Sequence, residues 1–162
     1  MKLAIITELK KAFNGDAWHG VNLMQQLNLV EPAIAFNHFI HNAHSIAELV
    51  LHMTAWTDEV NSRLLGAAAK EPVAGDWPTP QAETIKEWEK IVFDCKTSNE
   101  ELIRVCEGLS IVDWEAEVKD ERNRELGTGV TNLALVNGLI QHHAYHSGQI
   151  GLLLKFTHNR LI

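Results

Sequence analysis

Residues 45–66 read SIAELVLHMTAWTDEVNSRLLG, and this stretch decides the fold class. Ser45 and Glu48 form a capping box, in which the serine hydroxyl accepts a backbone N–H and the glutamate side chain reaches back to the cap. Apolar residues then recur at helical spacing: Ile46, Leu49, Val50, Met53, Trp56, Val60 and Leu64. Gly66 is typical of a helix stop. The stretch therefore predicts a long amphipathic helix over residues 45–65 with its apolar face, Trp56 included, in a core.

Three further stretches have helical periodicity and predict helices near residues 1–13, 80–107 and 131–157. The second is expected to begin at Thr79-Pro80, a cap followed by proline at the first helical position. The chain has neither an alternating strand pattern nor an internal repeat. The fold class predicted is all-α: a four-helix bundle that forms a single domain over residues 1–162.

The connections between these helices differ in character. A short helical stretch is expected over residues 17–29, and a loop or irregular turn over residues 33–43. Residues 66–80, GAAAKEPVAGDWPTP, are rich in proline and glycine. They predict a long connection that crosses the end of the domain. Residues 109–130 are expected to form a polar, solvated loop.

Composition excludes several classes of function. The chain has 162 residues, 14 basic and 21 acidic, with a net charge of −7, which disfavours binding to nucleic acid or to an anionic membrane. No apolar run reaches the ~18–20 residues of a membrane span, and the first residues do not resemble a signal peptide. Cys95 and Cys106 lie on one predicted helix roughly 16 Å apart, too far for a disulfide. A cytoplasmic protein is expected, with both cysteines as free thiols in the core or at its boundary.

The nine histidines contrast with a single tyrosine, and two of them stand out in the last predicted helix. His142 and His146 are four residues apart, so they lie on one helix face. The apolar stripe on that face comprises Leu135, Leu139, Ile150 and Leu153. Two buried imidazoles at this spacing suit a divalent metal such as Zn²⁺. A pair of core histidines hydrogen-bonded to carbonyl groups explains the spacing equally well.

A catalytic metal site usually needs a third protein ligand and an open position. His52 lies beside the apolar stripe of the 45–65 helix and is one candidate. His143 takes the place of the glutamate in the HExxH motif of metalloproteases, and it is expected to face a neighbouring helix edge or solvent. Gln149 could bind substrate or a metal-bound water, or pack as a helix polar residue. The remaining candidates, less favoured as ligands, are His19, His38, His41, His44 and His158. His38, His41 and His44 are three residues apart and would line up if residues 38–44 were helical, but a polar surface turn is expected there. His158 is expected to be solvated near the C-terminus.

Two stretches resemble the signatures of the DinB/YfiT-like family. Residues 44–56, HSIAELVLHMTAW, are similar to its second-helix signature, and residues 138–150, GLIQHHAYHSGQI, to its last-helix signature H-x-x-Y-H-x-G-Q-I. Shorter stretches at residues 17–20 and 76–78 are similar to one branch of the family. The resemblance implies a four-helix bundle, often dimeric, with a divalent metal ion held by three histidines. Histidine nitrogens accept Zn, Ni, Fe and Cu, and Zn, Ni or Fe is the cofactor expected. By position these match His52, His142 and His146.

The resemblance also implies an activity. The preferred one is a metal-dependent, thiol-dependent S-transferase that acts on a small-molecule substrate with a low-molecular-weight thiol, as a homodimer. The alternatives are a metal-dependent hydrolase that uses a metal-bound hydroxide, and a non-catalytic metal-binding bundle. Residues 31–43 match the family least and are candidates for shaping the pocket. The catalytic groups, the substrate, the thiol and the native metal stay open at this point.

Overall fold

The structure, a computed structural model, describes residues 2–119 and 130–158. These residues form seven helices and no strand, which confirms the predicted all-α class. The helices are α1 (Lys2–Asn14), α2 (Leu23–Leu27), α3 (Pro32–Ala35), α4 (Ile46–Leu64), α5 (Ile85–Gly108), α6 (Ile111–Glu115) and α7 (Asn132–His158). Within the same ranges, no helix combines the length and apolar character that crossing a bilayer requires.

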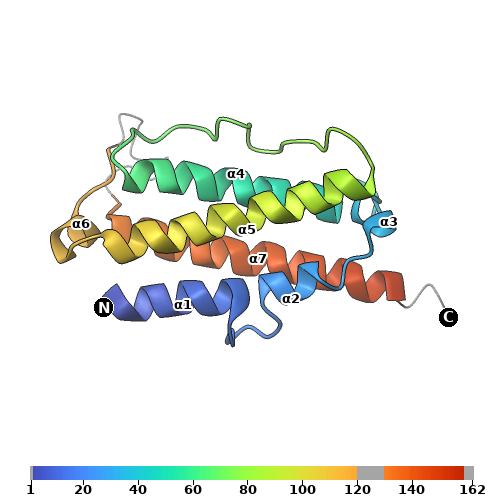
Figure 1. The fold of residues 1–162 in the computed structure, drawn as a ribbon, viewed down its shortest axis with the longest axis horizontal. Helices are drawn as coiled ribbons and strands as arrows, with labels where there is room; N and C mark the ends of the chain where they lie inside the picture. The colour runs from blue at the N-terminus through green and yellow to red at the C-terminus, as the bar shows by residue number, and fades with distance from the viewer. Residues whose placement is uncertain (1, 120–129, 159–162) are drawn as a thin grey trace.

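The longest helices lie side by side along the long axis of the molecule (Figure 1). Helices α1 and α7 run in one direction, and α4 and α5 run in the other. Helix α4 packs against both α5 and α7, while α1 packs against α7 and α5. This arrangement sets α4 and α7, the helices that carry the candidate metal ligands, next to each other.

Local capping explains where the helices begin. Helix α4 begins as predicted, because the Ser45 hydroxyl accepts the Glu48 N–H at 3.2 Å and Glu48 Oε2 accepts the Ser45 N–H at 2.8 Å. The predicted start of the next helix at Thr79-Pro80 was wrong. Helix α5 begins only at Ile85, because the hydroxyl of Thr84 accepts the backbone N–H of Glu87. Thr84 thus satisfies an N–H that the helix itself leaves unpaired.

The short elements also differ from the predictions. The helical stretch expected over residues 17–29 contracts to α2, which Asn22 caps together with Gln25. Residues 33–43 were expected to be irregular, but the chain forms one turn of helix at α3, with Pro32 at its start. The connection over residues 109–130 contains α6, which begins after a capping box at Ser110. Residues 120–129 of that connection lie outside the described ranges.

The connection between α4 and α5 returns along the length of α4 (Figure 1). It was expected to cross the end of the domain, and that expectation was wrong because α4 and α5 run in the same direction. The chain must therefore travel back to the end at which α4 began. We call residues 66–84 the strap. It is irregular, as predicted, and it carries Asp76 and Trp77 to the side of α4 on which His52 lies.

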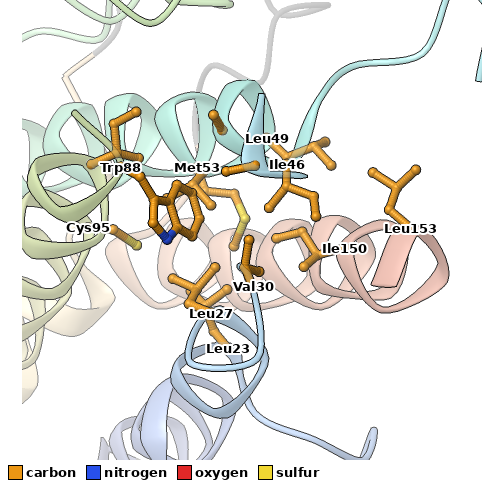
Figure 2. Close-up of a cluster of buried hydrophobic side chains, with 14 of the residues drawn as sticks. Leu23, Leu27, Val30, Ile46, Leu49, Met53, Trp88, Cys95, Ile150 and Leu153 are labelled. Carbon is orange, nitrogen blue, oxygen red and sulfur yellow. The ribbon is translucent and has the colours of Figure 1, made fainter. Parts of the chain in front are cut away.

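The core consists of two apolar clusters. One cluster joins α2, α4, α5 and α7 around Met53, Trp88 and Ile150 (Figure 2). The other joins α1, α4, α5 and α7 around Leu102 and Val136. Buried polar side chains lie between these clusters along the helices, among them Thr57, Ser98, Asn99 and His143. The buried face of α7 is therefore apolar towards both ends and polar at its middle, where His143 lies.

Candidate metal centre

Three histidines from α4 and α7 converge at one point. Nε2 of His142 lies 2.8 Å from Nε2 of His52 and 3.0 Å from Nε2 of His146. One nitrogen from each of the three residues lies within 4.8 Å of the other two, so the group could hold a metal ion. Two imidazole nitrogens on one tetrahedral Zn²⁺ at about 2.0–2.1 Å would lie about 3.3 Å apart. The observed spacing is close to that separation.

The tautomers of two of these rings follow from their second nitrogens. Nδ1 of His52 lies 2.5 Å from the backbone carbonyl oxygen of Asp76, and Nδ1 of His146 lies 2.6 Å from Oε1 of Gln149. Both oxygens only accept, so each Nδ1 donates its proton and each Nε2 keeps a lone pair. Nε2 of His142 faces both lone pairs and can offer at most one N–H to them. A cation where the three nitrogens meet would satisfy all three, and the donor set therefore fits a metal.

Burial favours the neutral form of these imidazole rings, which is the form that binds metal. Desolvation, with smaller contributions from His146 and His52, lowers the pKa of His142 to about 4. Desolvation also lowers the pKa of His146, although its hydrogen bond to Gln149 works in the opposite direction. A neutral imidazole has a lone pair to donate, whereas a protonated one does not. Nδ1 of His142 is buried and has no hydrogen-bond partner within the described residues, so it lacks the acceptor that the other two rings have.

His143 lies in the core rather than at an edge. Its side chain is 5% exposed, and its Nε2 lies 3.0 Å from the hydroxyl oxygen of Thr57 on α4. That hydroxyl donates to the carbonyl of Met53, so the imidazole N–H donates to the hydroxyl oxygen. His143 was expected to face a neighbouring helix edge or solvent; its ring does meet the neighbouring helix α4, but it lies in the core and not at an edge or in solvent. Desolvation lowers the pKa of His143 to about 3.

The true register of α7 explains this difference. The deeply buried positions of its apolar stripe are Val136, Leu139, His143, Ile150 and Leu153. His142 was placed in the middle of the stripe, but the structure places it at the edge, half-buried. At that edge its ring meets His52 and His146 and also reaches a pocket.

The strap covers one side of the three histidines. The indole of Trp77 stacks on the His52 ring with centroids 3.8 Å apart, and it also stacks on His44 at 3.6 Å. Asp76 holds His52 through its backbone carbonyl, and its carboxylate accepts the indole N–H of Trp56 at 2.7 Å. Trp56 was predicted to be a core residue, but it is half-buried because this polar contact draws its N–H to the strap. Residues 76–78 resemble one branch of the family, but nothing in their sequence predicted this role.

A pocket of about 490 Å³ opens beside the histidines. His52, Trp56 and Arg63 of α4 line one wall, and His142 and Leu139 of α7 line the other. The arrangement offers a ligand access to the point where the three nitrogens converge. Metal binding at a site with an open position is the chemistry that such an arrangement can support.

The other candidate residues lie elsewhere. His19 and His41 are exposed, and Nδ1 of His38 lies 2.9 Å from the carbonyl oxygen of Ala43 in a surface turn. The side chain of His158 lies outside the described residues. Cys95 and Cys106 are free, buried and on one helix, as predicted. Gln149 orients His146, and neither its sequence position nor its residue type specified this role in advance.

A comparison with family models places the chain. Residues 7–156 match the model described as the DinB family. The matched range spans nearly the whole chain and includes all three converging histidines. It confirms the resemblance that residues 44–56 and 138–150 indicated. No curated protein and no solved structure matches the chain.

Proposed function

The chain belongs to the DinB family, and on that premise we propose that it is a metal-dependent enzyme whose divalent ion is held by His52, His142 and His146. The observation that supports this proposal best is the convergence of three Nε2 atoms, two of them on rings whose Nδ1 protons are engaged. When bound, a divalent ion supplies Lewis acidity that lowers the pKa of a thiol or water at neutral pH. Imidazole ligands suit Zn, Ni, Fe and Cu, and we propose Zn, Ni or Fe as the ion.

The chain's own residues would orient and enclose this chemistry. The carbonyl of Asp76 and the side chain of Gln149 fix the rings of His52 and His146. Trp77 covers the His52 ring and limits its contact with water. The pocket between α4 and α7 provides room for a small-molecule substrate next to the histidines.

We propose thiol-dependent S-transfer as the reaction, with a low-molecular-weight thiol as the second substrate. Burial raises the pKa of Cys95 to about 11 and that of Cys106 to about 12. Both thiols are therefore protonated at neutral pH, and neither is a nucleophile for the pocket. These are the two cysteines of the chain, so a thiol-dependent reaction must use an added thiol.

The test begins with elemental analysis of untagged protein, followed by a screen of small electrophiles with and without added thiols. Stoichiometric metal and turnover that requires the thiol would support the transferase. Turnover of esters or amides without thiol would instead support the metal-dependent hydrolase. Stoichiometric metal without turnover in either arm would favour a non-catalytic metal-binding protein.

Three further features belong to the proposal. The long helices α1, α4, α5 and α7 would form the four-helix bundle of a single domain. The protein would act as a homodimer, since symmetric dimers are the commonest oligomers. Light scattering should give twice the chain mass of 18.2 kDa. The mass of a single chain over a wide concentration range would contradict the dimer. The cytoplasm is the proposed compartment, since it keeps thiols such as Cys95 reduced.

A further inference from the structure

The lining of the pocket beside the histidines extends along α4 from His52 to Arg63, and we call this pocket the groove. His52, Trp56, Val60 and Arg63 line it at spacings of four, four and three residues, so they share one face of α4. The rise of the helix places the Cα atoms of His52 and Arg63 about 16 Å apart. The histidines therefore lie towards one end of the groove and Arg63 lies towards the other.

Arg63 is held in place at its end of the groove. Its side chain is only 8% exposed. Nε donates to Oε1 of Glu59 at 3.0 Å, and Nη2 donates to the carbonyl of Lys70 at 2.8 Å. The guanidinium carbon also lies 5.9 Å from the ring of Trp56. These contacts fix the orientation of the guanidinium before any ligand arrives.

The guanidinium keeps donors that these contacts do not use. Arginine has five N–H donors, and two of them are engaged within the described residues. Arg63 lines the groove, so the remaining donors have access to a ligand there. Glu59 offsets the charge of Arg63, and the attraction for an anion therefore comes from oriented N–H donors in a partly buried wall.

The groove is polar at both ends and apolar between them. Val60, Leu135 and Leu139 form its middle. At the histidine end the carboxylate of Asp76 also lines the groove, with Oδ1 3.4 Å from Nδ1 of His52. An anionic group of a ligand is repelled by the carboxylate of Asp76, whereas beside Arg63 it meets oriented N–H donors. The groove thus has a direction that an elongated ligand can match.

We infer that Arg63 binds the anionic end of an elongated ligand whose other end reaches the histidine centre. The ligand class is a small molecule with a metal-binding group, an apolar middle and a carboxylate. Arg63 is on this basis a specificity-determining residue, and Glu59 is a positioning residue that orients it. The inference rests on the proposed function for the metal end of the ligand, whereas the carboxylate end depends on Arg63 alone.

The test measures the binding of ω-mercaptocarboxylic acids and of ω-mercaptoalcohols of the same length to zinc-loaded protein by calorimetry. Thiolate is the chosen head group because it binds Zn²⁺. The wild type should bind the acid at least about tenfold more tightly than the alcohol at the best chain length, as expected for a charged hydrogen bond. The double variant Glu59→Gln/Arg63→Gln, which leaves no unpaired buried carboxylate, should lose this preference and keep its affinity for the alcohol.

Arg104→Gln is the matched control, because it removes an exposed arginine on α5 that does not line the groove. It should keep the preference for the acid. Equal affinity of the wild type for acid and alcohol, or an unchanged preference in the double variant, would overturn the inference. Binding of straight-chain carboxylates against the corresponding alcohols is measured in parallel on metal-free protein. If zinc does not bind, the proposed function fails. The metal-free measurement still decides the inference, because a preference for the carboxylate that the double variant loses supports it and the absence of such a preference overturns it.

Discussion

The indole of Trp77 lies flat on the imidazole of His52, with ring centroids 3.8 Å apart and planes inclined by 9°. The contact joins the irregular strap to the helix that supplies one proposed metal ligand. It explains how a segment without regular structure can support a proposed metal ligand. The strap stacks on the His52 ring, and the backbone carbonyl of Asp76 accepts a hydrogen bond from His52 Nδ1–H.

Replacing Trp77 should therefore weaken metal binding without abolishing it. Trp77→Ala removes the stacking partner of His52, and we expect metal affinity to fall about tenfold, the lower range for residues that support a ligand. Trp77→Phe should keep most of the affinity because its ring can still stack. Chelator competition measures both values, with Trp18→Ala as the control because Trp18 is 99% exposed. Wild-type affinity in Trp77→Ala would show that the strap does not support the site.

Removing a proposed ligand should have a larger effect. His52→Ala, His142→Ala and His146→Ala each delete one of the three converging nitrogens, and each variant should lose stoichiometric metal. Metal content after extensive dialysis measures this loss. His41→Ala is the matched control, since His41 is exposed in a turn. Retention of one equivalent of metal in all three site variants would rule out this centre.

Much of the fold follows from local signals in the sequence. The capping box at Ser45 and the apolar periodicity after it predict α4, and the all-α class follows from the lack of any strand pattern. Thr79-Pro80 is a weaker guide, because a cap is defined by which N–H its side chain reaches, and Thr84 reaches that of Glu87. Local signals of equal quality compete over short distances, and tertiary packing selects among them.

The site was predictable only in part, for a different physical reason. Spacing places His142 and His146 on one face, and the family resemblance supplies His52. The helix turns by about 100° per residue, so choosing the wrong centre for the stripe exchanges the environments of His142 and His143. The roles of Asp76 and Trp77 depend on contacts across 20 or more positions of sequence, which no periodicity reveals.

His143 should matter for stability and not for metal. His143→Ala removes a buried ring and its hydrogen bond to Thr57, and the free energy of unfolding should fall by about 2–4 kcal/mol. Thr57→Val keeps the volume and removes the hydroxyl, so its cost should be smaller, about 1 kcal/mol. Urea denaturation measures both. Metal content should stay near one equivalent in each variant, and its loss in His143→Ala alone would indicate that His143 is a ligand.

The buried cysteines should make the protein less stable in alkaline solution. Burial raises the pKa of Cys95 to about 11 and that of Cys106 to about 12, whereas the unfolded thiols titrate at about 8.5. Between these values the unfolded state binds fewer protons than the folded state, so the free energy of unfolding falls as pH rises. At pH 10 the expected loss is about 1–2 kcal/mol per cysteine relative to pH 7.5.

The double variant Cys95→Ala/Cys106→Ala isolates this contribution from other groups that titrate at high pH. Its absolute stability should be lower at pH 7.5, because two small core side chains are shortened. Its further loss between pH 7.5 and pH 10 should, however, be smaller than that of the wild type. A thiol reagent should leave the native wild type unmodified at neutral pH and label both cysteines in urea, since both side chains are 0% exposed. An equal pH dependence of the two proteins in urea denaturation would show that these thiols are not held protonated by the core.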